Sequence, residues 1–291
     1  MVKPFRKPHR FKRKKPIYRN RFLGLGFLIL IFLFSIFYFL FFAPTFQVEK
    51  IIITGESKVS SQALKSLIEN KLENKILFLK TKTIFLVNLN DIKRDILNNF
   101  PQIAEIEIKR AFLDSLSVVI VERRGVANWC QGEKCFLLDN KGVIFDPIRV
   151  EEDSFFSTSA KSSVNDVSNG ARENQLLIKI VDKENSESSI LGEKVIEKEE
   201  LSKILAIESE LESGLKIPIK EFLISSEDKL IVATIEGWEI YFNLQSDIQW
   251  QMTKLRAVLD EKIPSEKRKD LEYIEVRFGN FAPFKYRAAA R

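Results

Sequence analysis

The longest uncharged stretch of the chain runs from Phe22 to Val48 and consists mainly of Leu, Ile and Phe between residues 23 and 43. At a helical rise of about 1.5 Å per residue, residues 23–43 span roughly 30 Å, which is the hydrocarbon thickness of a bilayer. Lipid offers no hydrogen-bond partner to the backbone, so such a segment is expected to be helical. We therefore predict a transmembrane helix over residues 22–43.

The alternative interpretation of this stretch is a cleaved signal peptide. The apolar region of a signal peptide is about 7–15 residues long and ends in a cleavage site with small residues. The run in this chain is longer, and Pro44 and Thr45 follow Ala43, which makes a poor cleavage site. We expect the helix to be retained as a single membrane anchor.

Charge is distributed unevenly on the two sides of the apolar run. The chain has a net charge of +6, but residues 1–21 contain ten Lys or Arg residues and no acid, so the remainder is net negative. The positive-inside rule then places the N-terminus in the cytoplasm and the residues after about Pro44 outside the cell membrane. We expect a single-pass protein with an extracytoplasmic C-terminal part.

The basic N-terminal segment, residues 1–21, admits two partners. Phe5, Phe11 and Tyr18 lie between its cations and could stack on the bases of a nucleic acid. A polybasic segment next to a membrane helix is also attracted to anionic lipid, and this interpretation is favoured, so no nucleic acid is expected. The segment has little apolar surface, and we predict that it is disordered.

The two cysteines, Cys130 and Cys135, lie on the predicted outer side. The surrounding residues are typical of two strand ends joined by a four-residue turn, and cross-strand neighbours can lie within disulfide reach. Two interpretations of this pair remain, a disulfide and a pair of reduced, half-buried thiols. A zinc site is not expected, because there is no further Cys and no outer His to complete four ligands.

Residues 46–122 show the element order of a small α+β unit. An apolar strand ends at Gly55, a helix capped near Ser60 or Ser61 follows, and a second helix is predicted to start at Asn90 as its N-cap. Alternating apolar residues then predict strands around 104–109 and 116–121. The order strand, helix, helix, strand, strand predicts helices packed on one face of a three-stranded sheet.

The second outer part, residues 123–287, is expected to be a mixed β-sheet domain with flanking helices. Strands are predicted near 176–181, 219–225, 230–236, 238–244 and 271–278, and residues 281–287 could add another. Helices are predicted from about Lys198 to a C-cap at Gly214, and from about Asp247. Residues 150–175 are rich in Ser, Asn and Glu, and we predict a disordered insertion there.

Several motifs in this order resemble the FtsQ/DivIB family of bacterial cell-division proteins, whose outer part begins with a POTRA domain. They are the join at 122–129 (Glu-Arg-Arg-Gly-Val-Ala-Asn-Trp), the hairpin at 138–145 (Leu-Asp-Asn-Lys-Gly-Val-Ile-Phe), Gly237-Trp238, Lys254-Leu255 and residues 274–278 (Ile-Glu-Val-Arg-Phe). The chain departs from the family pattern at Gly125 and Leu113, where prolines are usual, and at Glu275, where Asp is usual. The resemblance implies a POTRA domain followed by an FtsQ-type β-domain.

The residue inventory argues against catalysis. The only histidine is His9, in the basic N-terminal segment, so no Ser-His or Cys-His pair and no histidine-ligated metal site can form on the outer side. No phosphate-binding loop motif is present in the outer part. We expect no enzyme activity, no catalytic residues, no metal and no cofactor.

The resemblance implies a scaffold of the division machinery that acts at the septum. Its last strand would pair with FtsB, which travels with FtsL and leads to the septal peptidoglycan synthase complex. Carried over onto this sequence, the partner-binding residues are Arg277, Phe278, Asn280 and Tyr286. Arg and aromatic residues are common anchors of protein–protein interfaces.

Alternatives remain for both the site and the function. Phe278, Phe281 and Phe284 could simply cover the core of their own domain, and Pro283, which has no N–H, would interrupt regular strand pairing. Two other functions are alternatives: a POTRA protein of a secretion or assembly system, and a membrane-anchored cell-wall enzyme. Against the first, the sequence shows no series of amphipathic barrel strands after the POTRA-like unit, and against the second, it shows no nucleophile–base or metal site.

Overall fold

The computed structural model describes residues 21–288, except for residues 77–78, 113, 149–176 and 185–188. The predicted disordered segment 150–175 and nearly all of the basic N-terminal segment lie outside the described residues. Contacts divide the chain into two compact units, residues 1–54, 61–93 and 107–119 and residues 55–60, 94–106 and 120–291. The predicted domain limits, 46–122 and 123–287, stay predictions.

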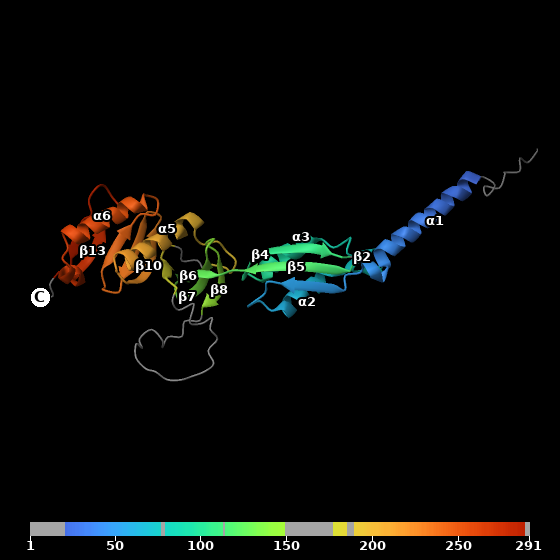
Figure 1. Ribbon diagram of the computed structural model, residues 1–291, viewed down its shortest axis with the longest axis horizontal. Coiled ribbons are helices and arrows are strands. Elements are labelled where there is room, and N and C mark those ends of the chain that lie inside the picture. Colours follow the sequence, from blue (N-terminus) through green and yellow to red (C-terminus); the bar gives the residue numbers. More distant parts are fainter. Residues whose placement is uncertain (1–20, 77–78, 113, 149–176, 185–188, 289–291) are drawn as a thin grey trace, which may run out of the picture. The chain divides into compact units, whose positions relative to one another are not determined.

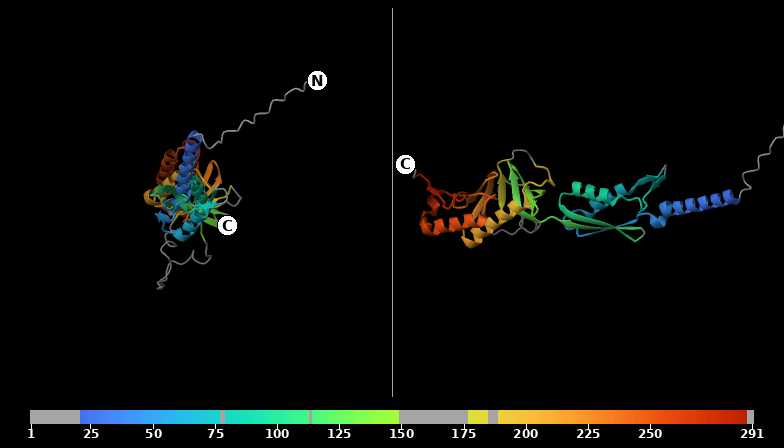
Figure 2. Two further views of the ribbon diagram at one scale, coloured as in Figure 1. Left: turned by 90° about the vertical axis from the view of Figure 1, so that its right-hand side faces the viewer. Right: turned by 90° about the horizontal axis from the view of Figure 1, so that it is seen from above.

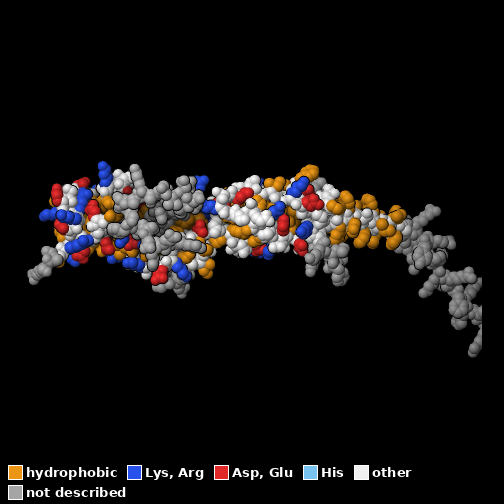
Figure 3. All heavy atoms as spheres, turned by 90° about the horizontal axis from the view of Figure 1, so that it is seen from below, with side chains coloured by type: hydrophobic (Ala, Val, Ile, Leu, Met, Phe, Trp, Pro, Cys, Tyr) orange, Lys and Arg blue, Asp and Glu red, His pale blue; other side chains and the backbone are white. Residues whose placement is uncertain are grey.

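The first helix, α1 (Arg21–Phe42), covers the predicted membrane span of residues 22–43 except for its last residue. Residues 24–42 form the one helix among the described residues that is long and apolar enough to cross a bilayer. Its Leu, Ile and Phe side chains between residues 25 and 39 are exposed (Figure 3). Because exposed apolar side chains are unfavourable in water, this surface suits lipid.

A three-stranded sheet with strand order β1-β5-β4 follows the anchor (Figure 1). It comprises β1 (Lys50–Thr54), β4 (Ile103–Ala111) and β5 (Ser115–Glu122), with β1 parallel to β5. The helices are α2 (Ser61–Leu72) and α3 (Leu89–Asn99). The strand–helix–helix–strand–strand order is confirmed, with one addition between the helices: the hairpin of β2 (Asn74–Ile76) and β3 (Leu79–Thr81).

The N-cap predicted for the second helix was wrong by two residues. Asn88 Oδ1 accepts hydrogen bonds from the backbone N–H groups of Asn90 and Asp91, at 3.2 and 3.4 Å. Asn88 therefore caps α3, and Asn90 lies inside the first turn of the helix.

The second sheet has nine strands in the order β14-β13-β12-β11-β10-β9-β6-β7-β8. In chain order, its first five strands are β6 (Gly125–Gln131), β7 (Lys134–Asp139), β8 (Ile144–Ile148), β9 (Lys179–Asp182) and β10 (Ile219–Ser226). The remaining four are β11 (Lys229–Thr234), β12 (Glu239–Phe242), β13 (Leu271–Glu275) and β14 (Phe284–Tyr286). The mixed sheet and the α+β class are confirmed.

Two helices, α5 (Lys198–Ser209) and α6 (Ile248–Glu261), lie along one face of this sheet (Figure 2). Their apolar stripes meet the sheet in one core. Its largest fully buried side chains include Trp129, Trp238, Phe222 and Phe242. α5 continues into a π-helical turn, Glu210–Gly214, and the left-handed residue after it is Lys216, with φ 56°. The helical segment ends at Gly214 as predicted, but its C-cap is Leu215 and not Gly214.

The turn between β7 and β8 needs its glycine. Asp139 Oδ1 accepts hydrogen bonds from the N–H groups of Lys141 and Val143, both at 2.9 Å, which fixes the turn. Gly142 has φ of +81°, and a Cβ there would lie 1.9 Å from the carbonyl oxygen of Ile196. Any larger residue would clash with backbone, so the turn predicted at Asn140-Lys141-Gly142 has a clear physical basis.

Candidate partner-binding edge

The last strand, β14, forms one edge of the nine-stranded sheet. It pairs antiparallel with β13 through Leu271 opposite Tyr286, Tyr273 opposite Lys285, and Ile274 opposite Phe284. No strand among the described residues pairs with its other side. An edge strand presents unpaired backbone N–H and C=O groups, which can bind the strand of another chain.

The direction of each backbone group in β14 follows from two hydrogen bonds. The carbonyl oxygen of Pro283 accepts from Glu275 N at 2.8 Å, and Arg287 N donates to the carbonyl oxygen of Asp270 at 2.9 Å. Because backbone direction alternates along a strand, residues 283, 285 and 287 face β13. The N–H and C=O groups of Phe284 and Tyr286 therefore face the open edge.

This alternation also places Pro283. The side of its backbone that lacks an N–H faces β13, and its carbonyl still accepts the bond from Glu275. Proline was expected to interrupt regular pairing here, but the structure retains this pairing bond and begins β14 one residue later. Pro283 therefore leaves the outward donors of β14 untouched.

Arg277 is engaged within its own domain. Its Nε and Nη2 each donate to the Glu275 carboxylate at 2.9 Å, and the guanidinium lies 4.6 Å from the centre of the Phe278 ring. Asp228 lies 3.7 Å from Nη1. The hydrogen bond to Glu275 raises the pKa of Arg277, while burial opposes that rise. The guanidinium of Arg277 is therefore used within the domain, where it contacts the Phe278 ring, and is not a free cation for a partner.

The turn between β13 and β14 exposes two aromatic rings. Phe278 is 53% exposed and Phe281 is 69% exposed, and Asn280 lies between them on the surface. Phe284 and Tyr286 instead pack against the core, with their rings edge to face at 5.6 Å. The alternative that these phenylalanines cover their own core holds for Phe284 and fails for Phe278 and Phe281.

The turn is held from inside by a buried lysine. Lys254 Nζ, from α6, donates to the carbonyl oxygens of Val276 at 2.6 Å and of Phe278 and Gly279, both at 3.1 Å. Burial lowers the pKa of Lys254, and the charge of Glu275 opposes that shift. Residues 254–255 were noted as a family motif, but the sequence did not indicate this role.

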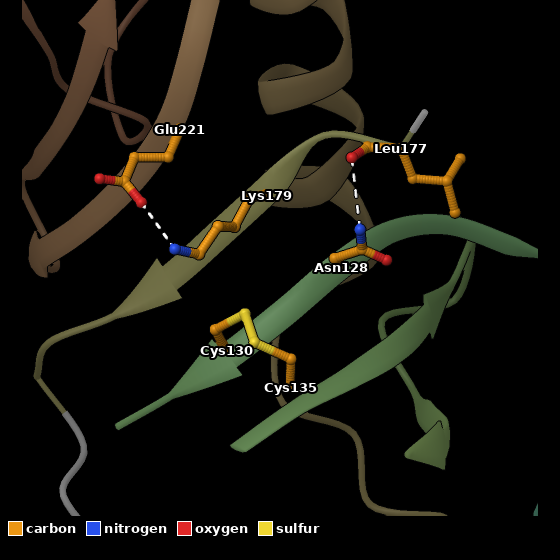
Figure 4. Close-up of a disulfide and its surroundings, with 6 residues drawn as sticks. All are labelled: Asn128, Cys130, Cys135, Leu177, Lys179 and Glu221. Atoms are coloured by element: carbon orange, nitrogen blue, oxygen red, sulfur yellow. Dashed lines mark hydrogen bonds and ion pairs between the residues drawn. A yellow bond between two sulfur atoms is a disulfide. The ribbon is translucent and has the colours of Figure 1, made fainter. Parts of the chain in front are cut away.

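The two cysteines occupy opposite positions on β6 and β7 (Figure 4). Their Cα atoms are 4.1 Å apart and the structure joins them as a disulfide. The turn between the strands is shorter than expected, since Gln131 pairs directly with Lys134. Gly132 takes the left-handed conformation there, with φ of +58°. Oxidation of this pair in the cell stays a prediction.

Among the described residues, no group of three or more His, Cys, Asp or Glu residues could hold a metal ion. His9 lies outside the described residues. The arrangement at β13 and β14, an open strand edge beside exposed aromatic rings, is suited to binding another polypeptide.

Comparison with protein-family models identifies residues 46–123 as a POTRA domain of the FtsQ type. The matched segment runs from Phe46, four residues after the end of α1, through β5. A comparison with curated proteins finds no significant match.

Proposed function

We propose that this member of the FtsQ/DivIB family of cell-division proteins is a non-enzymatic scaffold of the septal machinery. The FtsQ-type POTRA domain, which follows the one candidate membrane span found among the described residues, supports the family assignment. In this role it binds FtsB/FtsL-like bitopic proteins and links them to the septal peptidoglycan synthase complex. The N-terminus lies in the cytoplasm and the two outer domains lie beyond the membrane, at the division septum.

The observation that carries the binding proposal is the open edge of β14. Phe284 and Tyr286 direct their backbone groups away from β13, so a partner strand can form main-chain hydrogen bonds along this edge. Phe278 and Phe281 lie in the adjoining turn and supply apolar area. Such a surface combines main-chain affinity with side-chain specificity, which suits a short strand of a bitopic protein.

The four partner-binding residues that the family resemblance implies differ in their roles. Phe278 and Asn280 are exposed and available to a partner. Arg277 acts by positioning Phe278 through its bonds to Glu275. Tyr286 contributes its outward backbone groups, because its side chain already packs on the core.

A pair of substitutions at one position tests the strand-pairing mechanism. Tyr286→Ala and Tyr286→Pro both remove the ring, but only Tyr286→Pro also removes the outward N–H. We expect capture of a purified FtsB-like partner by the detergent-purified chain to be at least tenfold weaker for Tyr286→Pro than for Tyr286→Ala. Equal capture by the two variants would contradict pairing at this edge.

The cellular role is tested by depletion of the protein and imaging of a fluorescent fusion. A ring at mid-cell and filamentous cells after depletion are expected of a division scaffold. A uniform membrane signal together with normal septation would contradict the proposal. The Phe278→Glu variant should still form stable protein but fail to restore septation, because a charge at an exposed ring disturbs binding more than folding.

A further inference from the structure

The last carbonyl groups of α1 are hydrogen-bonded by side chains from the following domain. The final turn of a helix leaves carbonyl oxygens without helical partners. Thr83 Oγ1 donates to the carbonyl oxygen of Leu40 at 3.2 Å, and Thr81 Oγ1 donates to that of Phe41 at 2.7 Å. Gln47 Nε2 also donates to the carbonyl oxygen of Phe41, at 3.0 Å. The membrane helix therefore ends in a set of bonds made by folded domain residues.

The segment that supplies these threonines is paired with the chain leaving the helix. Val48 N donates to the carbonyl oxygen of Lys82 at 3.0 Å, and Ile84 N donates to that of Phe46 at 2.9 Å. Lys82 N in turn donates to Gln47 Oε1 at 2.7 Å. Thr81 and Thr83 are almost fully buried. Residues 81–84 are thus fixed directly beside the end of α1.

The turn after this segment presents apolar side chains outward. Arg110 Nε donates to the carbonyl oxygen of Ile84 at 2.8 Å, and its Nη2 donates to that of Val87 at 2.7 Å. Ile84 and Val87 are buried, but between them Phe85 is 49% exposed and Leu86 is 39% exposed. Surface turns normally carry polar residues, so a rigid turn that exposes two large apolar side chains calls for an apolar neighbour.

The exposed turn is continuous with the apolar surface of α1. The Phe85 ring centre lies 5.4 Å from that of Phe46, which lies 5.6 Å from that of Phe39 in α1. Phe39 is itself 56% exposed, on a helix that suits lipid on all sides. A chain of ring contacts therefore leads from the membrane helix to the turn.

A second exposed aromatic residue lies at the same end of the three-stranded sheet. The carbonyl oxygen of Asp114 accepts hydrogen bonds from Glu49 N at 2.9 Å and Lys50 N at 3.2 Å, a few residues after α1 ends. These bonds place the turn between β4 and β5 next to the start of β1. Phe112, in that turn, is 83% exposed.

We propose that Phe85, Leu86 and Phe112 insert into the lipid of the membrane that α1 crosses, at the boundary between headgroups and acyl chains. We call these three residues the membrane-contact surface. The bonds from Thr81, Thr83 and Arg110 fix the turn that carries Phe85 and Leu86 relative to the end of α1. The occupant of the membrane-contact surface is lipid because the surface continues that of a membrane helix. The inference rests on α1 spanning the membrane and is independent of the division role.

The test places an environment-sensitive fluorophore on single cysteines of the full chain, in a Cys130→Ser/Cys135→Ser background, reconstituted without partners into vesicles of zwitterionic and anionic lipid. Leu86→Cys and Phe112→Cys report on the surface, and Phe34→Cys in α1 gives the membrane reference. Ile190→Cys is the matched control, because Ile190 is apolar and 75% exposed but lies in the other unit.

We expect the probes at 86 and 112 to emit at shorter wavelength than the probe at 190. A shallow spin-labelled lipid should quench them at least threefold more strongly than the probe at 190. Emission and quenching at 86 and 112 that match position 190, while position 34 is strongly quenched, would overturn the proposal. A probe at 86 that becomes shielded only after a partner membrane protein is added would assign the surface to protein and equally overturn it.

Discussion

Lys254 Nζ donates a hydrogen bond of 2.6 Å to the carbonyl oxygen of Val276, which lies 22 positions later in the chain. The same ammonium group binds the carbonyls of Phe278 and Gly279. Three buried or half-buried carbonyl groups thus depend on one side chain. The Lys254 side chain therefore connects the packing of α6 to the shape of the turn that exposes Phe278.

Replacing Lys254 by methionine should therefore destabilise the domain and disturb the turn. Orphaned carbonyl groups cost about 1–3 kcal/mol each when buried, and partial rehydration reduces the total, so we expect a loss of about 2–3 kcal/mol in the free energy of unfolding. Denaturant unfolding of the purified chain measures it. Lys262→Met, an exposed site next to the end of the same helix, should change stability little. Equal effects of the two variants would contradict this role for Lys254.

Glu122 should make the stability of the chain dependent on acid. Its carboxylate accepts backbone N–H bonds from Ser57 at 2.7 Å, from Lys58 at 2.9 Å and from Val59 at 2.9 Å. Burial opposes ionisation, but these bonds outweigh it and lower the pKa of Glu122 below its ordinary value of 4.5. A lowered folded pKa gives stability that is present above pH 4.5 and is lost as the pH falls through the folded value.

Glu122→Gln should accordingly cost about 1–2 kcal/mol at neutral pH, because a neutral amide oxygen accepts weaker bonds. The difference between variant and parent should shrink as the pH falls below 4.5. Thermal unfolding across pH 3–7 gives both results. A difference that stays constant with pH would show that Glu122 acts through its shape and not through its charge.

Local chemistry explains which elements could be predicted from the sequence. Apolar alternation predicted β4 and β5, and Asp247 was recognisable as a helix start because the cap bonds only residues two and three positions away. The β2–β3 hairpin was missed because residues 75–81 contain no Gly, Pro or Asn to indicate a turn. The cap of α3 was misplaced because Asn88 and Asn90 are both good caps and only the bonds distinguish them.

The candidate site was predicted less completely than the fold. Arg277 and Phe278 were named, yet the partner of Arg277 is Glu275, two residues earlier, and that local pair could have been recognised. The role of Lys254 could not be recognised from the sequence, because its bonds join positions 22 to 25 residues apart. The edge position of β14 depends on strand order across the whole sheet, which no local pattern determines.

The Cys130–Cys135 disulfide should be present in protein isolated from the membrane and should add modest stability. It closes a short loop, with a sequence separation of 5, and loop entropy then predicts about 2 kcal/mol. Alkylation followed by mass measurement should detect free thiols only after reduction. Reduction should lower the unfolding free energy of the parent and leave a Cys130→Ser/Cys135→Ser variant unchanged. Free thiols in unreduced protein would contradict the prediction.

The two ends of α6 offer a final, internally controlled prediction. Asp247 Oδ1 accepts hydrogen bonds from Gln249 N at 2.8 Å and Trp250 N at 3.2 Å, at the end of the helix where backbone N–H groups lack partners. Asp247→Ala should therefore cost about 1 kcal/mol, and Asp247→Asn should retain most of the stability, since Asn caps nearly as well. Asp260 is exposed in the last turn, where a negative charge opposes the helix dipole, so Asp260→Ala should be neutral or slightly stabilising. Denaturant unfolding of the three variants measures these differences, and a loss at Asp260 equal to that at Asp247 would show that the cap bonds contribute nothing.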